Sequence, residues 1–324
     1  EQAARGVAVR HVVARGPYRE ALRPVVAELG PLRVMRPAER ELRSDLAPMV
    51  AEGGLVELSH EGWLTSTEDF VESQKHGSPP YRMDAFYRAV RRRTGILMED
   101  ARPMGGKYSF DAENRRPWKG SPPAPDPPTF TTDVVTNEVV DLVEDHFRRH
   151  PGSVEPSALP ATLDDVRRLW SWAKQACLPQ FGPFEDAMST ASSGLFHTRI
   201  SPLVNLHRLL PAEVVRDVSG LDIPIASQEG FVRQVIGWRE FVRHVHEATD
   251  GFRGLTGSDG DVGDRPGDGG WGRWAGESWH LSSEDWSDGG ASPRFLGADR
   301  PLPPAFWGAA SGLECLDRVV AEVW

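Results

Sequence analysis

The chain has 324 residues, of which 47 are acidic and 37 are basic, giving a net charge of −10. This length is sufficient for two ordinary domains. The acidic balance excludes a polybasic nucleic-acid binder, although a local basic groove remains compatible with it. No apolar run approaches the roughly 20 residues that a membrane-spanning helix needs. The sequence contains two cysteines, Cys177 and Cys315, which excludes a disulfide framework and favours a reducing, cytoplasmic setting.

The first 80 residues alternate short apolar runs with helical patterns, an order typical of an α/β layer with a parallel sheet. Residues 6–13 fit either a strand or the tail of a helix. We expect helices over 18–29 and 39–51, and strands over 32–35 and 56–58. Because such a layer normally starts with a strand, we expect residues 1–80 to form a Rossmann-like α/β domain that lacks its first strands.

The segment 82–119 differs from the rest of the chain in charge, with ten basic residues against five acidic ones. Phe86, Ala89 and Val90 give a helix at its start one apolar side. The Pro-rich stretch 121–128 follows as an extended linker, so we assign residues 81–128 to an interdomain region. The basic helix could contact a phosphate backbone or pair with acidic groups of the same protein, and the sequence leaves both interpretations open.

Residues 129–324 are predicted to be mostly α-helical. Thr162 and Asp165 form a capping-box pattern that opens one helix. Apolar residues at helical spacing form four stripes: Val135, Val139, Leu142 and Val143; Leu163, Val166, Trp170, Ala173 and Cys177; Phe231, Val235, Trp238, Val242 and Val245; and Leu313, Leu316, Val320 and Val323. No Gly, Asn or Pro marks an end to the last stripe, so we expect the chain to be a fragment.

Residues 249–300 interrupt this helical pattern with a segment rich in Gly and Asp, which we interpret as a surface insertion. Short catalytic and metal-binding motifs such as HExxH, a Walker loop or CxxC are absent from the sequence. His244 and His246 lie two residues apart on a predicted helix, which makes them a poor pair of metal ligands. By these rules alone, the sequence indicates an α/β domain and an α-helical domain without assigned chemistry.

Three longer segments carry more information. The first combines residues 82–98 (RMDAFYRAVRRRTGILM) with 105–115 (GGKYSFDAENR), the second is 194–202 (GLFHTRISP), and the third is 229–241 (EGFVRQVIGWREF). In this order they resemble the photolyase/cryptochrome superfamily. The first segment narrows the resemblance to the iron–sulfur bacterial cryptochromes and the prokaryotic (6-4) photolyase-related proteins. Tyr108 and Ser109 depart from this pattern, because the family usually has Trp and Asn there.

The resemblance implies a helical FAD-binding domain over residues 129–324, truncated at its C-terminus, and light-driven repair of UV-damaged DNA with (6-4) lesions as substrate. In this carbon–carbon lyase reaction, blue light excites reduced FAD, an electron passes to a flipped lesion, and the electron returns. A cryptochrome-like photoreceptor without repair activity is the main alternative, and a non-catalytic binding relative is another. The implied protein is a monomer that binds no membrane. We expect the fragment to be inactive alone.

The resemblance also assigns residues to the pocket. His197, Thr198 and Ser201 match the turn that holds the flavin diphosphate, where the two hydroxyls would donate hydrogen bonds at a helix start. Gln234, Trp238 and Arg239 match the wall shared by flavin and lesion, with Trp238 stacking on a base and Arg239 meeting cofactor or DNA phosphate. The ordinary alternatives are that residues 197–201 form a helix cap, that Trp238 is a core residue, and that the neighbouring charges form a surface ion pair.

Two further matches lie near the C-terminus. Trp307 matches a tryptophan of the electron-transfer route to FAD, with a core aromatic as the ordinary alternative. Cys315 matches the first of four cysteines that hold a [4Fe–4S] cluster. Because such a cluster needs four thiolates, we expect it only in a longer parent protein. A lumazine-type antenna is a further cofactor that the resemblance allows.

Overall fold

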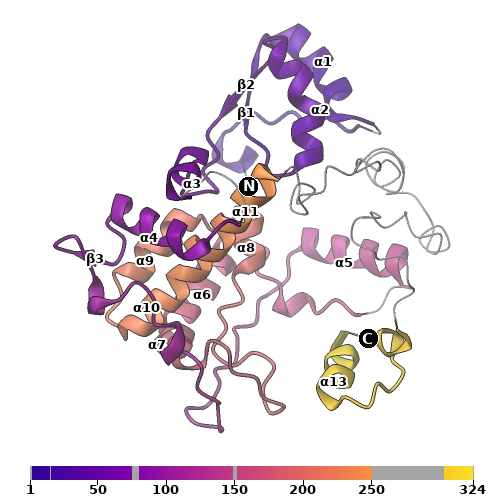
Figure 1. Cartoon of the computed structure of the whole chain (residues 1–324). Coiled ribbons are helices and arrows are strands. Elements are labelled where there is room, and N and C mark those ends of the chain that lie inside the picture. The colour runs from indigo at the N-terminus through magenta and orange to yellow at the C-terminus, as the bar shows by residue number, and fades with distance from the viewer. Residues whose placement is uncertain (1, 15, 75–79, 149–151, 250–302, 324) are drawn as a thin grey trace. The chain divides into compact units, whose positions relative to one another are not determined.

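The computed structural model describes residues 2–14, 16–74, 80–148, 152–249 and 303–323 (Figure 1). The chain divides into two compact units, one formed by Glu1–His60 with Thr249–Glu322 and the other by Glu61–Ala248 with Val323–Trp324. Nearly all of the predicted insertion 249–300 lies outside the described residues. Among the described residues, no helix combines the length and the apolar character needed to cross a membrane.

The first unit contains a small parallel sheet, as predicted. Strands β1 (Leu32–Met35) and β2 (Leu55–Leu58) pair in parallel, with Leu32 opposite Leu55. Helix α1 (Tyr18–Leu29) precedes β1, and helix α2 (Arg40–Ala51) connects the two strands. These bounds agree with the predicted elements to within one residue.

Helices α1 and α2 supply the core on one face of this sheet. Leu46, Met49 and Leu55 are buried, and Leu22 and Val26 of α1 pack against them. On the opposite face the side chains of Met35, Val56 and Leu58 are exposed. In the part of the chain that is described, β1 and β2 form the whole parallel sheet. The predicted α/β class is therefore confirmed in part, as two strands with helices on one face.

The N-terminal residues differ from the prediction. Residues 7–14, predicted as a strand or a helix tail, are irregular and exposed after the short helix η1 (Ala3–Arg5). An apolar run becomes a strand only where it pairs with another strand, and none of the described strands pairs with residues 7–14. Near the C-terminus, η10 (Pro304–Trp307) is followed by α13 (Glu314–Val323), which confirms the predicted last helix.

The second unit is mainly helical. Its only described strands are the antiparallel pair β3 (Met98–Glu99) and β4 (Arg102–Pro103), so past residue 130 the described chain has no strand, as predicted. Its helices are α3 (Thr67–Ser73), α4 (Met83–Thr94), η2 (Met104–Gly106), η3 (Asp111–Glu113), α5 (Val134–Phe147), η4 (Pro156–Ala158), α6 (Leu163–Trp172), η5 (Ala173–Cys177), α7 (Leu178–Phe184), α8 (Ser201–Asn205), α9 (Pro211–Ser219), α10 (Ile225–Val232), η6 (Arg233–Glu240) and α11 (Phe241–Ala248).

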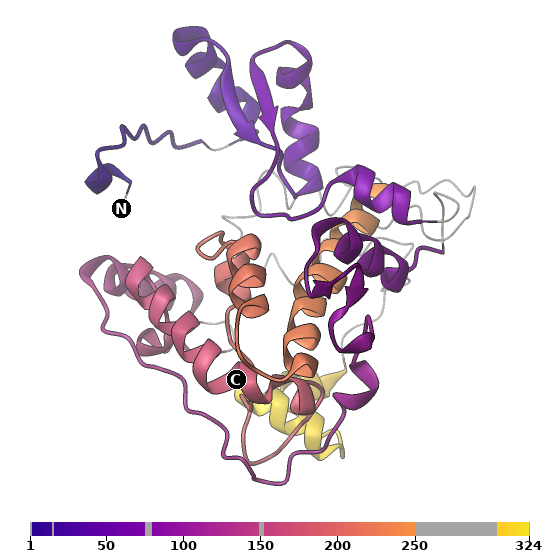
Figure 2. The same cartoon turned by 90° about the vertical axis from the view of Figure 1, so that its left-hand side faces the viewer.

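Two of these segments, η5 and η6, are π-helices. Helices α10, η6 and α11 follow one another as a single continuous rod (Figure 2). Helix α7 packs against α10, and Gly182 permits this contact: a Cβ there would lie 2.8 Å from the Ser227 backbone nitrogen. The predicted capping box is confirmed, since the Thr162 hydroxyl accepts from the Asp165 N–H at 3.2 Å.

Three of the predicted apolar stripes are not buried as stripes. In the last stripe, Leu313 and Val323 are exposed and Val320 is buried. On α5, Val135, Val139 and Leu142 are exposed, and it is Val140 that is buried. In the stripe that starts at Phe231, Trp238 and Val242 are 46% and 45% exposed. A π-helix closes its hydrogen bonds between residues five apart, so η6 rotates the residues after it relative to those before it.

Candidate functional site

A hollow of about 410 Å³ opens in the second unit. Four segments far apart in the sequence form its wall: the start of α4, the loop around η3, the end of α7, and η6. The lining side chains are those of Met83, Asp84, Tyr87, Ser109, Asp111, Arg115, Glu185, Asp186, Arg233, Gln234 and Trp238.

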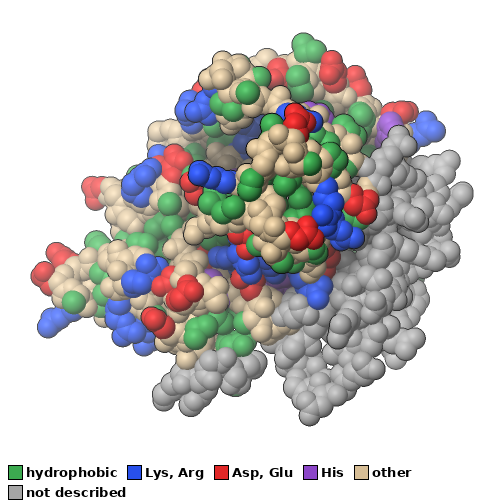
Figure 3. All heavy atoms as spheres, turned by 90° about the horizontal axis from the view of Figure 1, so that it is seen from above, with side chains coloured by type: hydrophobic (Ala, Val, Ile, Leu, Met, Phe, Trp, Pro, Cys, Tyr) green, Lys and Arg blue, Asp and Glu red, His purple; other side chains and the backbone are tan. Residues whose placement is uncertain are grey.

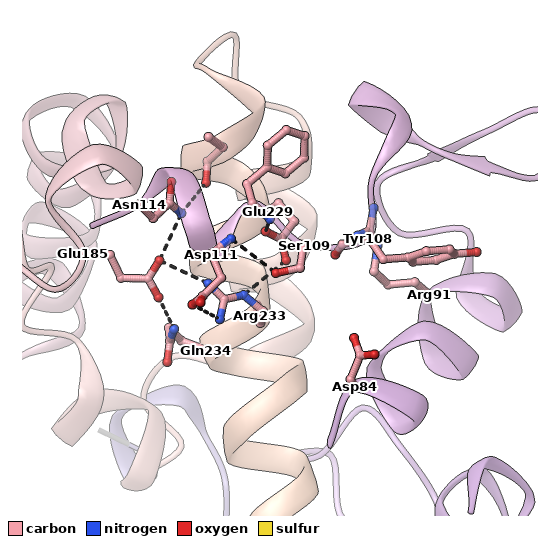
Figure 4. Close-up of polar contacts among 12 residues, drawn as sticks. Asp84, Arg91, Tyr108, Ser109, Asp111, Asn114, Glu185, Glu229, Arg233 and Gln234 are labelled. Carbon is pink, nitrogen blue, oxygen red and sulfur yellow. Dashed lines mark hydrogen bonds and ion pairs between the residues drawn. The ribbon is translucent and has the colours of Figure 1, made fainter. Parts of the chain in front are cut away.

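Arg233 holds three of these segments together and is only 5% exposed. Its Nη1 lies 2.9 Å from Asp111 Oδ1, its Nη2 3.4 Å from Glu185 Oε2, and its Nε 3.3 Å from Glu229 Oε1 (Figure 4). A buried cation needs such partners, because an unpaired charge inside a protein is costly. One guanidinium therefore fixes η3, the end of α7 and the α10–η6 rod around the hollow.

Acidic side chains outnumber basic ones on the wall by four to two. Burial raises the pKa of Glu185 and of Glu229. Burial also acts to raise the pKa of Asp111, but Arg115 and Arg233 outweigh it and the pKa is lowered. For Arg233, burial acts to lower the pKa, and the three carboxylates outweigh it, so the pKa is raised. The acidic excess disfavours a phosphate in the hollow and offers hydrogen-bond acceptors to an uncharged ligand.

The loop 105–115 reaches the hollow because buried charges hold it on two sides. Glu229 accepts a hydrogen bond from the Phe110 N–H at 2.8 Å. Arg91, which is fully buried, anchors the other side through three backbone carbonyl groups: Ile96 at 3.1 Å, Leu97 at 2.6 Å and Tyr108 at 2.8 Å.

Gly230 allows the residues of η3 and α7 to approach α10 closely. Asn114 Nδ2 donates to Glu185 Oε2 and to the Ala226 carbonyl, each at 3.1 Å. A Cβ at position 230 would lie 2.7 Å from Asn114 Nδ2 and 2.8 Å from Glu185 Oε2. Any larger residue would therefore displace the Asn114 amide and the Glu185 carboxylate, of which the second lines the hollow.

The structure brings together two of the residues predicted for the pocket, Gln234 and Trp238. The amide Nε2 of Gln234 donates to Glu185 Oε1, and Trp238 lines the hollow with 46% of its surface exposed. The π winding of η6 contributes to this arrangement, because Arg233 and Trp238 are five residues apart and line the same hollow.

The predicted phosphate turn, residues 197–201, leads into α8. Thr198 is buried, whereas His197 and Ser201 are exposed, and Ser201 is the first residue of this helix. Arg199 is also exposed and has a left-handed backbone with φ of 58°. No side chain caps the helix. A hydroxyl and a guanidinium are donors that a diphosphate can use, so the exposed side chains of Ser201 and Arg199 fit the diphosphate of FAD.

These turn residues do not line the hollow, but α7 contacts both features. The ring of Phe181 on α7 lies 6.3 Å from the His197 ring, edge to face. Directly before α7, Cys177 Sγ at the end of η5 lies 3.7 Å from the His197 carbonyl oxygen. Glu185 and Asp186, which follow α7, line the hollow. The same helix therefore supports the turn and the wall.

Arg239 is engaged away from the hollow. Its Nη1 donates to the Gly62 carbonyl at 2.9 Å, and its guanidinium lies 3.9 Å from the centre of the Trp63 ring. The neighbouring Glu240, fully buried, accepts from the N–H groups of Leu64 and Thr65. The structure therefore separates Arg239 from Gln234 and Trp238, with which it was predicted.

Trp307 and Cys315 belong to the first unit. Trp307 ends η10 and is 61% exposed, and Cys315 is an exposed residue of α13. Cys177 is buried in the second unit, where burial raises its thiol pKa to about 12. In the part of the chain that the structure describes, no group of three or more His, Cys, Asp or Glu residues could hold a metal ion. The residues present therefore do not fit a [4Fe–4S] cluster, which needs four thiolates.

Most of the wall, including Glu185, Asp111 and Tyr87, was not predicted from the sequence. Burial and then Glu229 raise the pKa of Tyr87, which keeps its phenol protonated. One signal was available: Glu229 and Arg233 are opposite charges four residues apart, next to the apolar residues of the stripe that starts at Phe231. Such a pair in an apolar segment indicates a buried polar network rather than a solvated face.

Comparison with known proteins gives two matches. Residues 1–159 match the family model described as deoxyribodipyrimidine photo-lyase-related protein. A curated protein, the (6-4) photolyase of Agrobacterium fabrum, is 28% identical over 314 residues, which cover 95% of this chain and 55% of that protein. The chain therefore spans about half the length of this relative.

Proposed function

Since this chain is a relative of the photolyase-related proteins, as its sequence predicted, we propose that it serves FAD-dependent, light-driven repair of UV-damaged DNA, with (6-4) lesions as substrate. The hollow that gathers Gln234 and Trp238 carries this proposal. A base that has left the duplex stack needs a flat aromatic surface and a few polar groups, and these two side chains offer both.

Different residues of the wall contact different parts of such a base. Trp238 stacks on its face, and the Gln234 amide meets its polar edge. Glu185 fixes the orientation of that amide by accepting from its Nε2, which leaves the amide oxygen as an acceptor for an N–H of the base. The acidic excess of the wall keeps the phosphates outside while the uncharged base enters.

The residues of the phosphate turn would hold the cofactor. Thr198, Arg199 and Ser201 supply the donors for the FAD diphosphate. When bound, reduced FAD supplies the light-excited electron that the repair of the lesion requires. Trp307, as an electron-transfer residue, and Cys315, as a cluster ligand in a longer protein, remain parts of the proposal, as does a lumazine-type antenna.

Repair in light and in darkness tests this function. Because the fragment is expected to be inactive alone, the longer parent protein is purified with flavin and incubated with an oligonucleotide that contains one (6-4) photoproduct, and the restored bases are counted by chromatography. We expect restoration under blue light and none in darkness. An oligonucleotide with a cyclobutane dimer is the matched control for the type of lesion.

Two results would contradict the proposal and favour the alternatives. A protein whose FAD is reduced by light but which restores no bases would be a cryptochrome-like photoreceptor. A protein that retains no flavin through purification would be a non-catalytic binding relative.

A further inference from the structure

The N-terminal part of α4 separates the acidic hollow from a second, basic groove. This groove has a volume of about 540 Å³ and lies between α4 and the end of α3. Its charged lining consists of Arg82, Arg88 and Arg92, opposed by Glu72 and Asp84. Asp84, together with Met83, also lines the acidic hollow, so the two cavities share one turn of helix.

Most of the arginines of α4 are occupied within the protein. Arg88 pairs with Asp84 at 3.0 Å, and Arg93 pairs with Asp69 at 2.5 Å. Arg91 is buried on backbone carbonyls. These three arginines therefore contact groups of the same protein, which is one of the two interpretations that the sequence left open for the basic helix.

Arg82 and Arg92 behave differently. Both residues are exposed, both line the groove, and neither guanidinium has an ion pair or hydrogen bond with another described residue. Ten residues of helix correspond to about 15 Å. Phosphates of one DNA strand follow one another at about 3.4 Å of duplex axis, so the two guanidiniums can contact different phosphates of the same strand.

We propose that this groove binds the phosphodiester backbone of DNA beside the nucleotide whose base enters the acidic hollow. The assignment of the base to the hollow rests on the proposed function. The two cavities differ in the sign of their charge. The negatively charged phosphate therefore binds to the arginines of the groove, and the uncharged base binds to the carboxylates and Trp238 of the hollow.

Binding of undamaged DNA in the dark tests this proposal, because it requires no photochemistry. Affinity for a fluorescein-labelled oligonucleotide is measured by anisotropy over a range of salt concentrations. The double variant R82A/R92A should bind about tenfold more weakly at low salt. Loss of two phosphate contacts should also reduce the slope of log K against log salt by about 1.4 to 1.8.

Two matched variants make the test specific. R167A/R216A removes the same charge from exposed positions on α6 and α9 and should leave affinity and slope nearly unchanged. E72Q removes the acid of the groove that has no ion pair with another described residue, and it should tighten binding, a gain that damage to the fold would not produce.

The proposal is overturned if R82A/R92A binds as the wild type does, or if both double variants weaken binding equally. It is also overturned if the groove arginines are needed for an acidic peptide such as polyglutamate but not for DNA. Absence of light-driven repair would defeat the proposed function and leave this binding measurement intact.

Discussion

At the scale of single residues, the contacts of buried polar groups fix the position of the helical rod that lines the hollow. Glu240 is fully buried, and its carboxylate accepts from Thr65 Oγ1 at 2.6 Å and from the Thr65 N–H at 3.1 Å. His244, one turn further, contacts the same hydroxyl at 2.8 Å through Nε2. These contacts fasten the segment before α3 to the rod that bears Gln234 and Trp238.

His244 should make the stability of the protein depend on pH. Burial, reinforced by Arg243, lowers its pKa from 6.5 to about 4. In the unfolded chain, His244 therefore becomes protonated below about pH 6.5. In the folded chain, it becomes protonated only below about pH 4. Stability contributed by neutral His244 is present above pH 6.5 and falls as the pH decreases through this window, by about 3 kcal/mol in total.

The measurement is urea unfolding of the wild type and His244→Asn from pH 7 to pH 4. Burial raises the pKa of Glu240, which acts in the opposite direction, so the difference between the two proteins isolates the histidine. His146→Asn, at an exposed position on α5, serves as the control. Parallel stability profiles for the wild type and His244→Asn would contradict this interpretation.

At the scale of elements, the sequence predicted regular helices and strands well and failed where winding or pairing is decided by distant groups. Helix α1 and strand β1 have the predicted bounds because local apolar periodicity determines them. The stripe from Phe231 predicted a regular helix, and Phe231 and Val235 are buried as expected. Trp238 is exposed instead of buried, because η6 winds as a π-helix. The buried contacts of Arg233 and Glu240 hold the two ends of this segment. Neither anchor is visible in hydrophobic periodicity.

The contact of α7 with α10 is the element-scale feature that a substitution tests most directly. A Cβ at Gly182 would lie 2.8 and 2.9 Å from backbone atoms of Ser227 and Ala226, which have no rotamer to change. Gly182→Ala should therefore destabilise the protein by about 1 to 3 kcal/mol in urea unfolding. Gly220→Ala, whose nearest contacts would be at 3.6 Å, should change stability by no more than about 0.5 kcal/mol. Equal stabilities for the two variants would show that the helices are not packed this closely.

At the scale of the whole molecule, net charge is a poor guide to what the protein binds. On the face drawn in Figure 3, Lys and Arg side chains are interspersed with Asp and Glu side chains rather than forming one continuous field. The functional contrast is local: an acidic hollow and a basic groove share the first turn of α4. An overall charge of −10 therefore does not conflict with DNA binding at the groove.

The candidate site could be predicted from the sequence only through family resemblance. That resemblance identified Gln234 and Trp238, which share the hollow. It also grouped Arg239 with them, although that guanidinium lies on Gly62 and Trp63. Asp111 begins the short helix η3 and Glu185 directly follows α7. No periodic pattern marks either residue, and only the fold brings their carboxylates to Arg233.

The rate at which the longer parent protein repairs a (6-4) photoproduct in light, measured for Trp238→Ala and for the wild type at equal bound flavin, tests the central claim most directly. Stacking of one base on an aromatic ring contributes about 1 to 3 kcal/mol. We expect repair by this variant at limiting substrate to slow by about 5- to 150-fold, while Trp118→Ala, outside the hollow, repairs at nearly the wild-type rate. Repair by Trp238→Ala at the wild-type rate would contradict the assignment of this hollow as the site that receives the lesion.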